Sequence, residues 1–375
     1  MLVKRPAYYA QFQCLGSQCK DNCCIGWEID IDQKTNDFYQ ALPGPFGDRL
    51  RASISSPKDG FFLLQQERCP FLNQNNLCDI ILTLGESHLC QICTDHPRFY
   101  EWFGDYKEAG ISLCCEGAGK LMFQSQEPIQ FEVVSEEEPS EPFSGNAELF
   151  HQLLQTRESI FSLLQNRKLS IAHRLLLLSV MADQLQDALE DEDYASLPLI
   201  AEQFSDPDRS VALLERIRKI PTESMDQQQI FSQILSVYRQ LEPLSDQWSS
   251  MLVKLEKNLS VLTEHIPAFL NKAAREYEYE HMAVYWIYRY FMKSCFDRDM
   301  ISKVNFAVVS YLVILLLDIQ VWMDTGHFSL EDRIFTAKEY SKQIEYSTDN
   351  LEALADAAWE NQAFQTAALR QVLCE

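Results

Sequence analysis

Ten of the twelve cysteines lie between Cys14 and Cys115, and only Cys295 and Cys374 fall in the rest of the chain. Within this stretch they form four groups, with the sequences CLGSQCKDNCC, CPFLNQNNLC, CQIC and CC. A gap as short as that in CQIC lets two thiolates from one turn bind the same metal centre, and a distant pair can complete the ligand shell. The pattern therefore predicts a metal or iron–sulfur site.

Zinc and iron–sulfur clusters both take thiolate ligands, so the cysteine spacing has to distinguish them. Ten clustered cysteines are enough for two tetrahedral zinc sites. The C-x2-C-x2-C spacing of ferredoxins and the C-x3-C-x2-C spacing of radical S-adenosylmethionine enzymes are absent, which argues against those two classes but not against a cluster. Adjacent cysteines point in different directions on most backbones, so at most one of each such pair is expected to bind a given ion.

The overall charge limits the class of partner. The composition is that of a globular protein, with 46% hydrophobic and 23% charged residues, but the net charge is −23 and the pI is near 4.7. Such a surface repels a phosphate backbone and attracts basic segments, including lysine-bearing protein surfaces. We therefore expect no nucleic-acid partner, and solubility remains the alternative explanation of the charge.

The sequence predicts neither a membrane anchor nor a secretory signal. Its start, MLVKRPAYYAQFQC, lacks the apolar region of a signal peptide. The most apolar run, residues 306–317, is shorter than the roughly 20 residues that cross a bilayer. We therefore expect a cytoplasmic protein, and a reducing compartment favours metal binding by the cysteines over disulfides.

The periodicity of the chain changes along its length. Residues 1–123 hold most turn signals, so we expect a loop-rich cysteine-cluster domain with short strands at 60–64 and in a hairpin formed by CPFLNQNNLCDI. Residues 124–146 have the composition of an exposed acidic linker, in which IQFEVV can form one strand. Residues 147–375 follow the helical period. The predicted fold is mainly α, with an all-α domain after the cysteine domain and a substrate cleft between them.

Three apolar stripes at three- and four-residue spacing predict core-facing helices over residues 178–189, 230–241 and 248–262. The apolar run 306–317 predicts a buried central helix. Glycine is almost absent between Gly145 and Gly326, which fits a helical bundle and leaves no place for a phosphate-cradling loop.

The segment DHPRFY directly follows the CQIC group and places three polar side chains near the predicted centre. Arg98 can hold a carboxylate in bidentate fashion, and Asp95 or His96 can orient a ligand. These three residues are our candidates for cofactor binding. The alternative is a turn that is fixed by a local Asp95–Arg98 pair.

A second candidate is the aromatic stretch 277–291, in which seven aromatic side chains can stack on an adenine or enclose a cationic amine. Core packing is the favoured interpretation of this stretch. Its candidate catalytic groups are Tyr285, Glu280 and His281, although a surface pair is the simpler explanation for the last two.

The succession of CLGSQCKDNCC, CPFL…CDI, CQICTDHPRFY and CCEG resembles the flagellin lysine N-methylases of the FliB type, and the resemblance continues through the helical half. The front part is similar to the YkgJ-like cysteine-rich domains, which chelate zinc or iron. Those domains open with a tighter C-x2-C-x2-CC, so the first ligands of this chain remain open. With four cysteines per cluster, the candidate ligands in order of preference are Cys19, Cys23, Cys90, Cys93, Cys69, Cys78, Cys14 and Cys24.

The resemblance implies a methyltransferase of the bacterial flagellum, which moves a methyl group from S-adenosylmethionine to lysine side-chain amines of flagellin and carries a 4Fe-4S cluster. The lysine must be neutral, because a protonated amine with a reference pKa of about 10.4 has no lone pair. A desolvating aromatic pocket lowers that pKa, and a carboxylate or tyrosine oxygen can orient the amine. Two alternatives are an iron–sulfur redox or metal-carrier protein and a zinc-stabilised helical adaptor that binds flagellin without catalysis.

Overall fold

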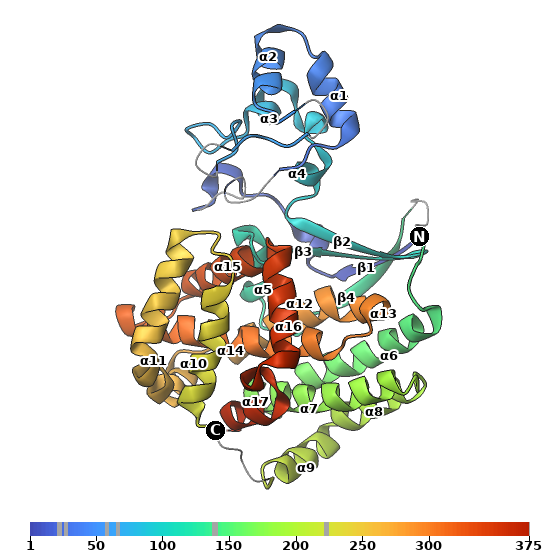
Figure 1. Cartoon of the computed structure of the whole chain (residues 1–375), viewed down its shortest axis with the longest axis vertical. Helices are drawn as coiled ribbons and strands as arrows, with labels where there is room; N and C mark the ends of the chain where they lie inside the picture. The colour runs from blue at the N-terminus through green and yellow to red at the C-terminus, as the bar shows by residue number, and fades with distance from the viewer. Residues whose placement is uncertain are drawn as a thin grey trace.

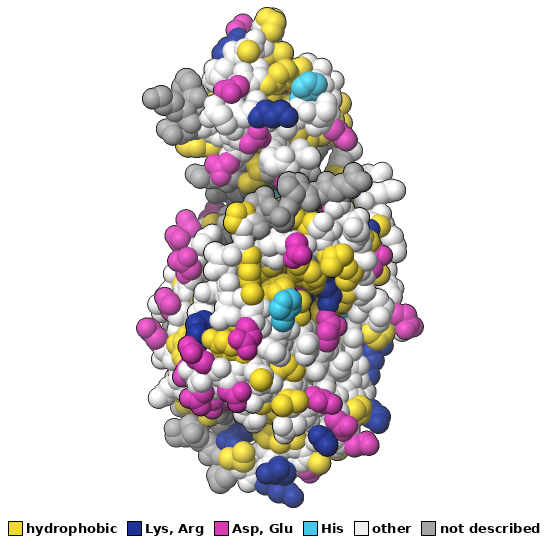
Figure 2. All heavy atoms as spheres, turned by 90° about the vertical axis from the view of Figure 1, so that its right-hand side faces the viewer, with side chains coloured by type: hydrophobic (Ala, Val, Ile, Leu, Met, Phe, Trp, Pro, Cys, Tyr) yellow, Lys and Arg dark blue, Asp and Glu magenta, His cyan; other side chains and the backbone are white. Residues whose placement is uncertain are grey.

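The structure is a computed structural model and describes residues 1–20, 25, 29–56, 60–64, 68–136, 142–220 and 225–374. Figure 1 shows two unequal lobes, a small one formed by the cysteine-rich segment and a large one that is mainly helical. The mainly α fold expected from the sequence is confirmed. On the face drawn in Figure 2, acidic side chains are scattered over both lobes and outnumber the basic ones.

The small lobe has its own apolar core and little regular structure. Its core is built around Ile29, Tyr39, Leu50, Phe62 and Phe71. Four short helices surround this core, namely α1 (Gln33–Ala41), α2 (Gly44–Ala52), α3 (Asp79–Leu84) and α4 (Gln91–Asp95). The expected hairpin is reduced to a single bridge between Leu72 and Cys78, and the expected strand at 60–64 to isolated bridges of Phe61 and Phe62.

A four-stranded sheet joins the small lobe to the large one. Its order is β2 (Arg98–Phe103), β3 (Tyr106–Ile111), β1 (Leu2–Pro6) and β4 (Phe131–Ser135). Strand β1 runs parallel to β3 and antiparallel to β4, so the first residues of the chain lie between segments more than a hundred residues away.

The sheet changes the domain boundaries that the sequence suggested. Strand β4 lies inside the expected linker 124–146, and the ring of Phe131 packs against Phe161 and Tyr288 at centroid distances of 4.9 and 4.7 Å. Helix α5 (Glu116–Gln124) and the end of β2 contribute Met122 and Phe103 to the core of the large lobe. Residues 1–123 are therefore divided among the cores of the two lobes and a small third cluster of Phe12, Ile111 and Ala118. The physical reason is that β4 pairs with β1, which fixes part of the expected linker in the sheet.

The large lobe is a layered bundle of helices (Figure 1). The three helices expected from apolar stripes are confirmed within α7, α10 and α11, whose stripe residues are buried. The helices of this lobe are α6 (Ala147–Leu164), α7 (Ile171–Glu190), α8 (Ser196–Ser205), α9 (Pro207–Ile217), α10 (Gln227–Gln240), α11 (Asp246–Lys272), α12 (Glu276–Tyr290), α13 (Ser294–Asp297), α14 (Ile301–Thr325), α15 (Leu330–Glu345), α16 (Thr348–Glu360) and α17 (Thr366–Leu373).

Helix α14 is the central helix of this lobe. It contacts α7, α11, α12, α15 and α16, and 83% of its most apolar window is buried. At 25 residues it is longer than the apolar run that predicted it, and by length and composition it could cross a membrane. A helix that is apolar on all sides is expected in the core of a large bundle, and its burial accounts for its composition.

Candidate functional site

Six cysteines from distant parts of the sequence line one cavity in the small lobe. The cavity has a volume of about 210 Å³, and its remaining wall is mostly apolar, with Ile29, Tyr39 and Phe62 among its residues. The six are Cys14, Cys19, Cys69, Cys78, Cys90 and Cys93. Cys23 and Cys24, also candidate ligands, lie outside the described residues. We call this space the cysteine cavity.

Local backbone structure presents the thiols to the cavity. Asn73 closes the turn between Cys69 and Cys78, because its side-chain oxygen accepts hydrogen bonds from the backbone N–H groups of Asn75 and Leu77 at 2.9 and 3.1 Å. Cys78 is the N-cap residue of α3. In the same way Cys90 is the N-cap residue of α4, and Cys93 lies in the first turn of that helix.

The thiols are close enough to influence one another. Burial raises the pKa of Cys69 to about 11, and the neighbouring Cys78 and Cys90 add to that effect. Burial also raises the pKa of Cys78, against the backbone N–H groups of Ile81 and Ile80. In contrast, a hydrogen bond from Cys93 lowers the pKa of Cys90, although burial opposes it. Cys69, Cys78, Cys90 and Cys93 therefore form one interacting group.

This donor set fits an iron–sulfur cluster. In a 4Fe-4S cluster each thiolate binds a different iron, so the sulfurs surround a volume rather than a point, and backbone N–H groups directed at sulfur tune such centres. Both features occur here, in thiols around a shared cavity and in amides at Cys69 and Cys78. Within the described ranges no three His, Cys, Asp or Glu side chains form a group that could hold a single metal ion.

The three polar residues of DHPRFY line a second cleft beside the cysteine cavity. This cleft has a volume of about 490 Å³ and contains Asp95, His96 and Arg98 together with Asp30 and Asp32. Its aromatic wall comes from β2, through Phe99, Tyr100 and Trp102. We call it the acidic cleft.

The contacts of these residues differ from the local ion pair that was the alternative. Asp95 accepts a hydrogen bond from the side chain of Gln91 at 2.9 Å. The Arg98 guanidinium lies over the rings of Tyr9 and Phe12, at 6.0 and 5.2 Å from their centroids. His96 lines both the acidic cleft and the cysteine cavity.

His96 also contacts the large lobe. Its Nε2 atom lies 3.4 Å from the hydroxyl of Tyr346, and the two rings meet edge to face at 6.0 Å. Tyr346 directly follows α15 and lines a third space of about 490 Å³ between the lobes, the inter-lobe cleft. The His96–Tyr346 contact therefore lies where the three spaces approach one another.

Tyr285 belongs to a buried polar network that it forms with Glu345, Arg289, Tyr290 and Ser112. Its hydroxyl donates to Glu345 at 2.7 Å and accepts from Arg289 at 2.6 Å. Tyr290 also donates to Glu345, at 3.0 Å, and Arg289 donates to the hydroxyl of Ser112 at 3.1 Å. Burial raises the pKa of Tyr285 well above its usual range, so this phenol stays neutral and acts as a hydrogen-bond donor.

Glu280 and His281 are fully buried in the large lobe and are not the surface pair that was expected. Glu280 accepts charged hydrogen bonds from Arg167 and Arg174, at 2.9 and 2.7 Å. His281 has one ring nitrogen 2.9 Å from the carbonyl of Met122 and the other 3.0 Å from that of Glu127. These contacts connect α12 with neighbouring elements. The other aromatic residues of α12 are mostly buried in the core, as the favoured interpretation predicted.

The inter-lobe cleft contains residues that sequence reasoning missed. Helix α15 contributes Phe335, Lys338, Glu339 and Lys342, and Tyr346 continues the row. Their spacing of three and four residues places them on one helix face. The sequence contains this three- and four-residue spacing. A stripe of mixed charges has the same pattern whether it faces solvent or a second lobe, so only the tertiary structure identifies it as part of a cleft.

Comparison with known proteins identifies the family. Residues 157–371, from α6 to α17, match the profile of the FliB lysine N-methylase C-terminal domain. The chain belongs to the FliB family. The family match covers most of the large lobe and leaves the cysteine cavity outside it.

Curated relatives match over a shorter part of the FliB-family chain. A lysine-N-methylase from Salmonella typhimurium is 30% identical over 127 residues, which are 30% of this chain and 30% of that protein. The lysine-N-methylase of Salmonella choleraesuis is 29% identical over the same share of each chain. The flagellar biosynthetic protein FliU of Salmonella muenchen is 30% identical over 127 residues, or 72% of its length. No solved structure matches the chain significantly.

Proposed function

We propose that this FliB-family protein transfers methyl groups from S-adenosylmethionine to lysine side-chain amines of flagellin, in the cytoplasm, with a 4Fe-4S cluster in the cysteine cavity. The observation that carries the proposal is the match of residues 157–371 to the lysine N-methylase family. The names of two relatives, a lysine-N-methylase and a flagellar biosynthetic protein, support the reaction class and the flagellar substrate.

In this proposal the cluster ligands are Cys69, Cys78, Cys90 and Cys93. These four thiols interact with one another and with the core of the small lobe. Cys14 and Cys19 line the same cavity, but neither belongs to that core. When bound, the cluster supplies a covalent cross-link between segments that have little regular structure of their own.

The acidic cleft is the proposed entry for the acceptor lysine. Asp30 and Asp95 attract and orient a cationic amine, and the aromatic wall with Trp102 contacts it. Because the carboxylates favour the charged form, the amine has to lose a proton before transfer. His96, where this cleft adjoins the cysteine cavity, is the group proposed to take up the proton. The amine nitrogen then bonds to the methyl carbon while the carbon–sulfur bond breaks, and the electron pair remains on sulfur as S-adenosylhomocysteine forms.

The test is mass spectrometry of flagellin peptides after anaerobic incubation with the purified protein and isotopically labelled S-adenosylmethionine. Labelled methyl groups on lysine are the expected result. Iron with acid-labile sulfide and visible absorption is expected in the same preparation, whereas colourless protein that contains only zinc would support the adaptor alternative. Folded, iron-loaded protein that undergoes reversible reduction but labels no lysine would leave the redox alternative and overturn the methyltransferase.

A further inference from the structure

The inter-lobe cleft has the size of a small-molecule site and a charge opposite to that of the whole protein. Its volume of about 490 Å³ falls within the range of ligand pockets. Three lysines and one glutamate line it, in a chain whose net charge is −23. The lysines come from both lobes, because Lys20 belongs to the small lobe and Lys338 and Lys342 to α15.

The charged groups of α15 are held at low exposure beside the cleft. Lys338 is 5% exposed and Glu339 is 9% exposed. The ammonium of Lys338 lies 3.3 Å from Glu339 and 3.4 Å from Glu116, so it forms ion pairs within the protein. Lys338 and Glu339 both line the cleft, where they place a cation and an anion side by side.

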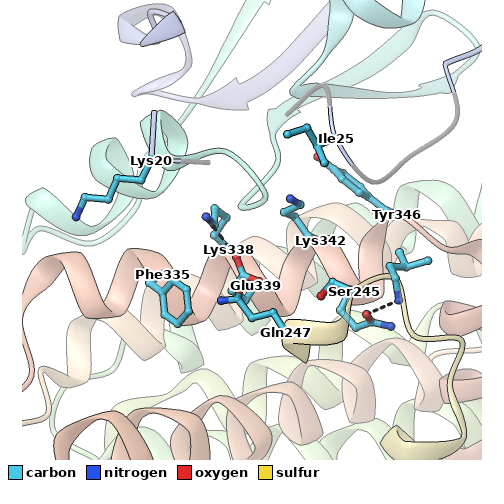
Figure 3. A pocket seen from close by; sticks show the side chains of 11 residues that line it. Lys20, Ile25, Ser245, Gln247, Phe335, Lys338, Glu339, Lys342 and Tyr346 are labelled. Atoms are coloured by element: carbon cyan, nitrogen blue, oxygen red, sulfur yellow. Dashed lines mark hydrogen bonds and ion pairs between the residues drawn. The ribbon is translucent and has the colours of Figure 1, made fainter. Parts of the chain in front are cut away.

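Figure 3 shows how the remaining groups are arranged around this pair. Lys338 and Lys342 project from α15 on the side where Lys20 and Ile25 lie. The ring of Phe335 lies at one end of the row, and Tyr346 lies at the other, beside Ile25. Ser245 and Gln247, at the start of α11, add polar groups to the opposite wall.

We propose that the inter-lobe cleft binds the methyl donor through its zwitterionic amino-acid end. The donor carboxylate lies between Lys338 and Lys342, its ammonium faces Glu339, and an aromatic ring at the end of the row stacks on the adenine. This assignment rests on the proposed function for the identity of the donor. The pattern of an adjacent cation and anion with flanking rings matches the carboxylate, the ammonium and the adenine of an amino acid joined to a nucleoside.

The inter-lobe cleft also lies next to the proposed acceptor site. Tyr346, at one end of the cleft, contacts His96, which lines the acidic cleft proposed for the lysine. Donor and acceptor would thus approach the His96–Tyr346 junction from different sides. Contacts between Lys20 and Glu331, at 2.6 Å, and between the backbone N–H of Lys20 and Glu116, at 3.0 Å, connect the two lobes at the edge of the cleft.

The test measures binding, so that it does not depend on turnover. Anaerobically purified holoprotein is dialysed to equilibrium against S-adenosylhomocysteine, and separately against adenosine, which lacks the amino-acid end. Substitutions Glu339→Gln and Lys342→Met are each expected to weaken binding of S-adenosylhomocysteine about tenfold or more and to leave adenosine binding unchanged. Lys254→Met, which removes a lysine of α11 that pairs with Asp324 away from the cleft, is the matched control and is expected to bind both ligands normally.

A second measurement on the unsubstituted protein avoids any folding defect. Acetylation of Lys342 by a lysine-directed reagent, followed by mass spectrometry, is expected to slow several-fold when S-adenosylhomocysteine is present, while acetylation of Lys254 does not change. Unchanged acetylation of Lys342 at saturating ligand, or normal ligand affinity in both variants, would overturn the assignment. If the donor assignment fails in this way but the protein methylates flagellin, the proposed function stands and only the assignment of the cleft is wrong. If the cleft binds S-adenosylhomocysteine but flagellin is not methylated, only the proposed function is refuted.

Discussion

Substitution Glu345→Gln tests the buried polar network that joins α12 to the end of α15. One carboxylate oxygen of Glu345 accepts hydrogen bonds from Tyr285 at 2.7 Å, Tyr290 at 3.0 Å and Arg289 at 2.6 Å. The Glu345 side chain is fully buried and that of Arg289 is 17% exposed. Glutamine keeps the shape and one accepting oxygen, so the substitution removes the charge and little else.

Glu345→Gln is expected to lower the stability of the protein because the Arg289 guanidinium loses its charged partner. Removing one partner of a buried ion pair costs about 3–5 kcal/mol, because the remaining charge is left in a medium of low polarity. Arg289 keeps its contact with Ser112 and its position over the ring of Phe99, at 4.5 Å, which offsets part of the loss. We therefore expect a decrease of about 3 kcal/mol in the free energy of unfolding of Glu345→Gln.

The assay is urea unfolding followed by intrinsic fluorescence for the wild type, Glu345→Gln, Arg289→Met and the double variant. Because the double variant leaves no unpaired charge, its loss should be smaller than the sum of the single losses by about 2 kcal/mol or more. A loss below about 1 kcal/mol in Glu345→Gln, or strictly additive losses, would refute the view that the two residues act as a buried ion pair.

Three further substitutions test the cysteine cavity, a buried imidazole and the packing behind the acidic cleft. Cys90→Ser should lose most of the iron and sulfide measured by chemical analysis. The control Cys295→Ser, which removes a buried thiol of the large lobe whose pKa burial raises to about 12, should retain them. Equal iron and sulfide contents in the two variants would remove Cys90 from the proposed ligands. Burial lowers the pKa of the His281 imidazole in the folded protein. Below about pH 6.5 the unfolded chain binds a proton at this residue more readily than the folded protein does. The free energy of unfolding is therefore unaffected above that pH and decreases as the pH falls below it. In His281→Gln the fall between pH 7.5 and 5.5 should be smaller when urea midpoints are compared, and an identical fall would contradict this. Gly110→Ala places a Cβ atom 2.1 Å from the ring of Phe99 in β2 and should lower the free energy of unfolding by about 1–3 kcal/mol in the same assay. Gly119→Ala, whose nearest contact is at 3.4 Å, should not lower it. Equal stability of the two variants would exclude the clash.

Much of the large lobe could be predicted because its helices carry complete local signals. The stripes ending at Leu189 and Leu241 repeat at helical spacing over several turns, and their residues are buried as the period predicts. The sheet was harder, since β1 and β4 are short and depend on partners far along the chain. A strand of five residues such as 131–135 carries little information on whether it pairs or stays in a linker.

The functional residues differ in the same way in how far the sequence predicts them. Clustered cysteines predicted a metal or iron–sulfur centre from their number and spacing, since few other roles explain so many thiols in one stretch. The four cysteines that we propose as ligands could not be selected from the sequence, because Cys69, Cys78, Cys90 and Cys93 come together through the turn at Asn73 and the start of α4, which converge on one core. Glu280 was proposed for chemistry because of its aromatic neighbours. Only the fold reveals that its carboxylate is bound by Arg167, between α6 and α7, and by Arg174 of α7.

What the sequence determined by itself is therefore the class of fold and the resemblance to a family, because each depends on composition, spacing or periodicity along the chain. The cysteine-based centre stays a prediction from the same spacing. The tertiary structure alone decided the three spaces around His96 and Tyr346 and the row of charges on α15. These features arise from side chains 250 residues apart that come together when the two lobes pack. Contacts of that kind depend on how whole elements are placed, and no local pattern records them.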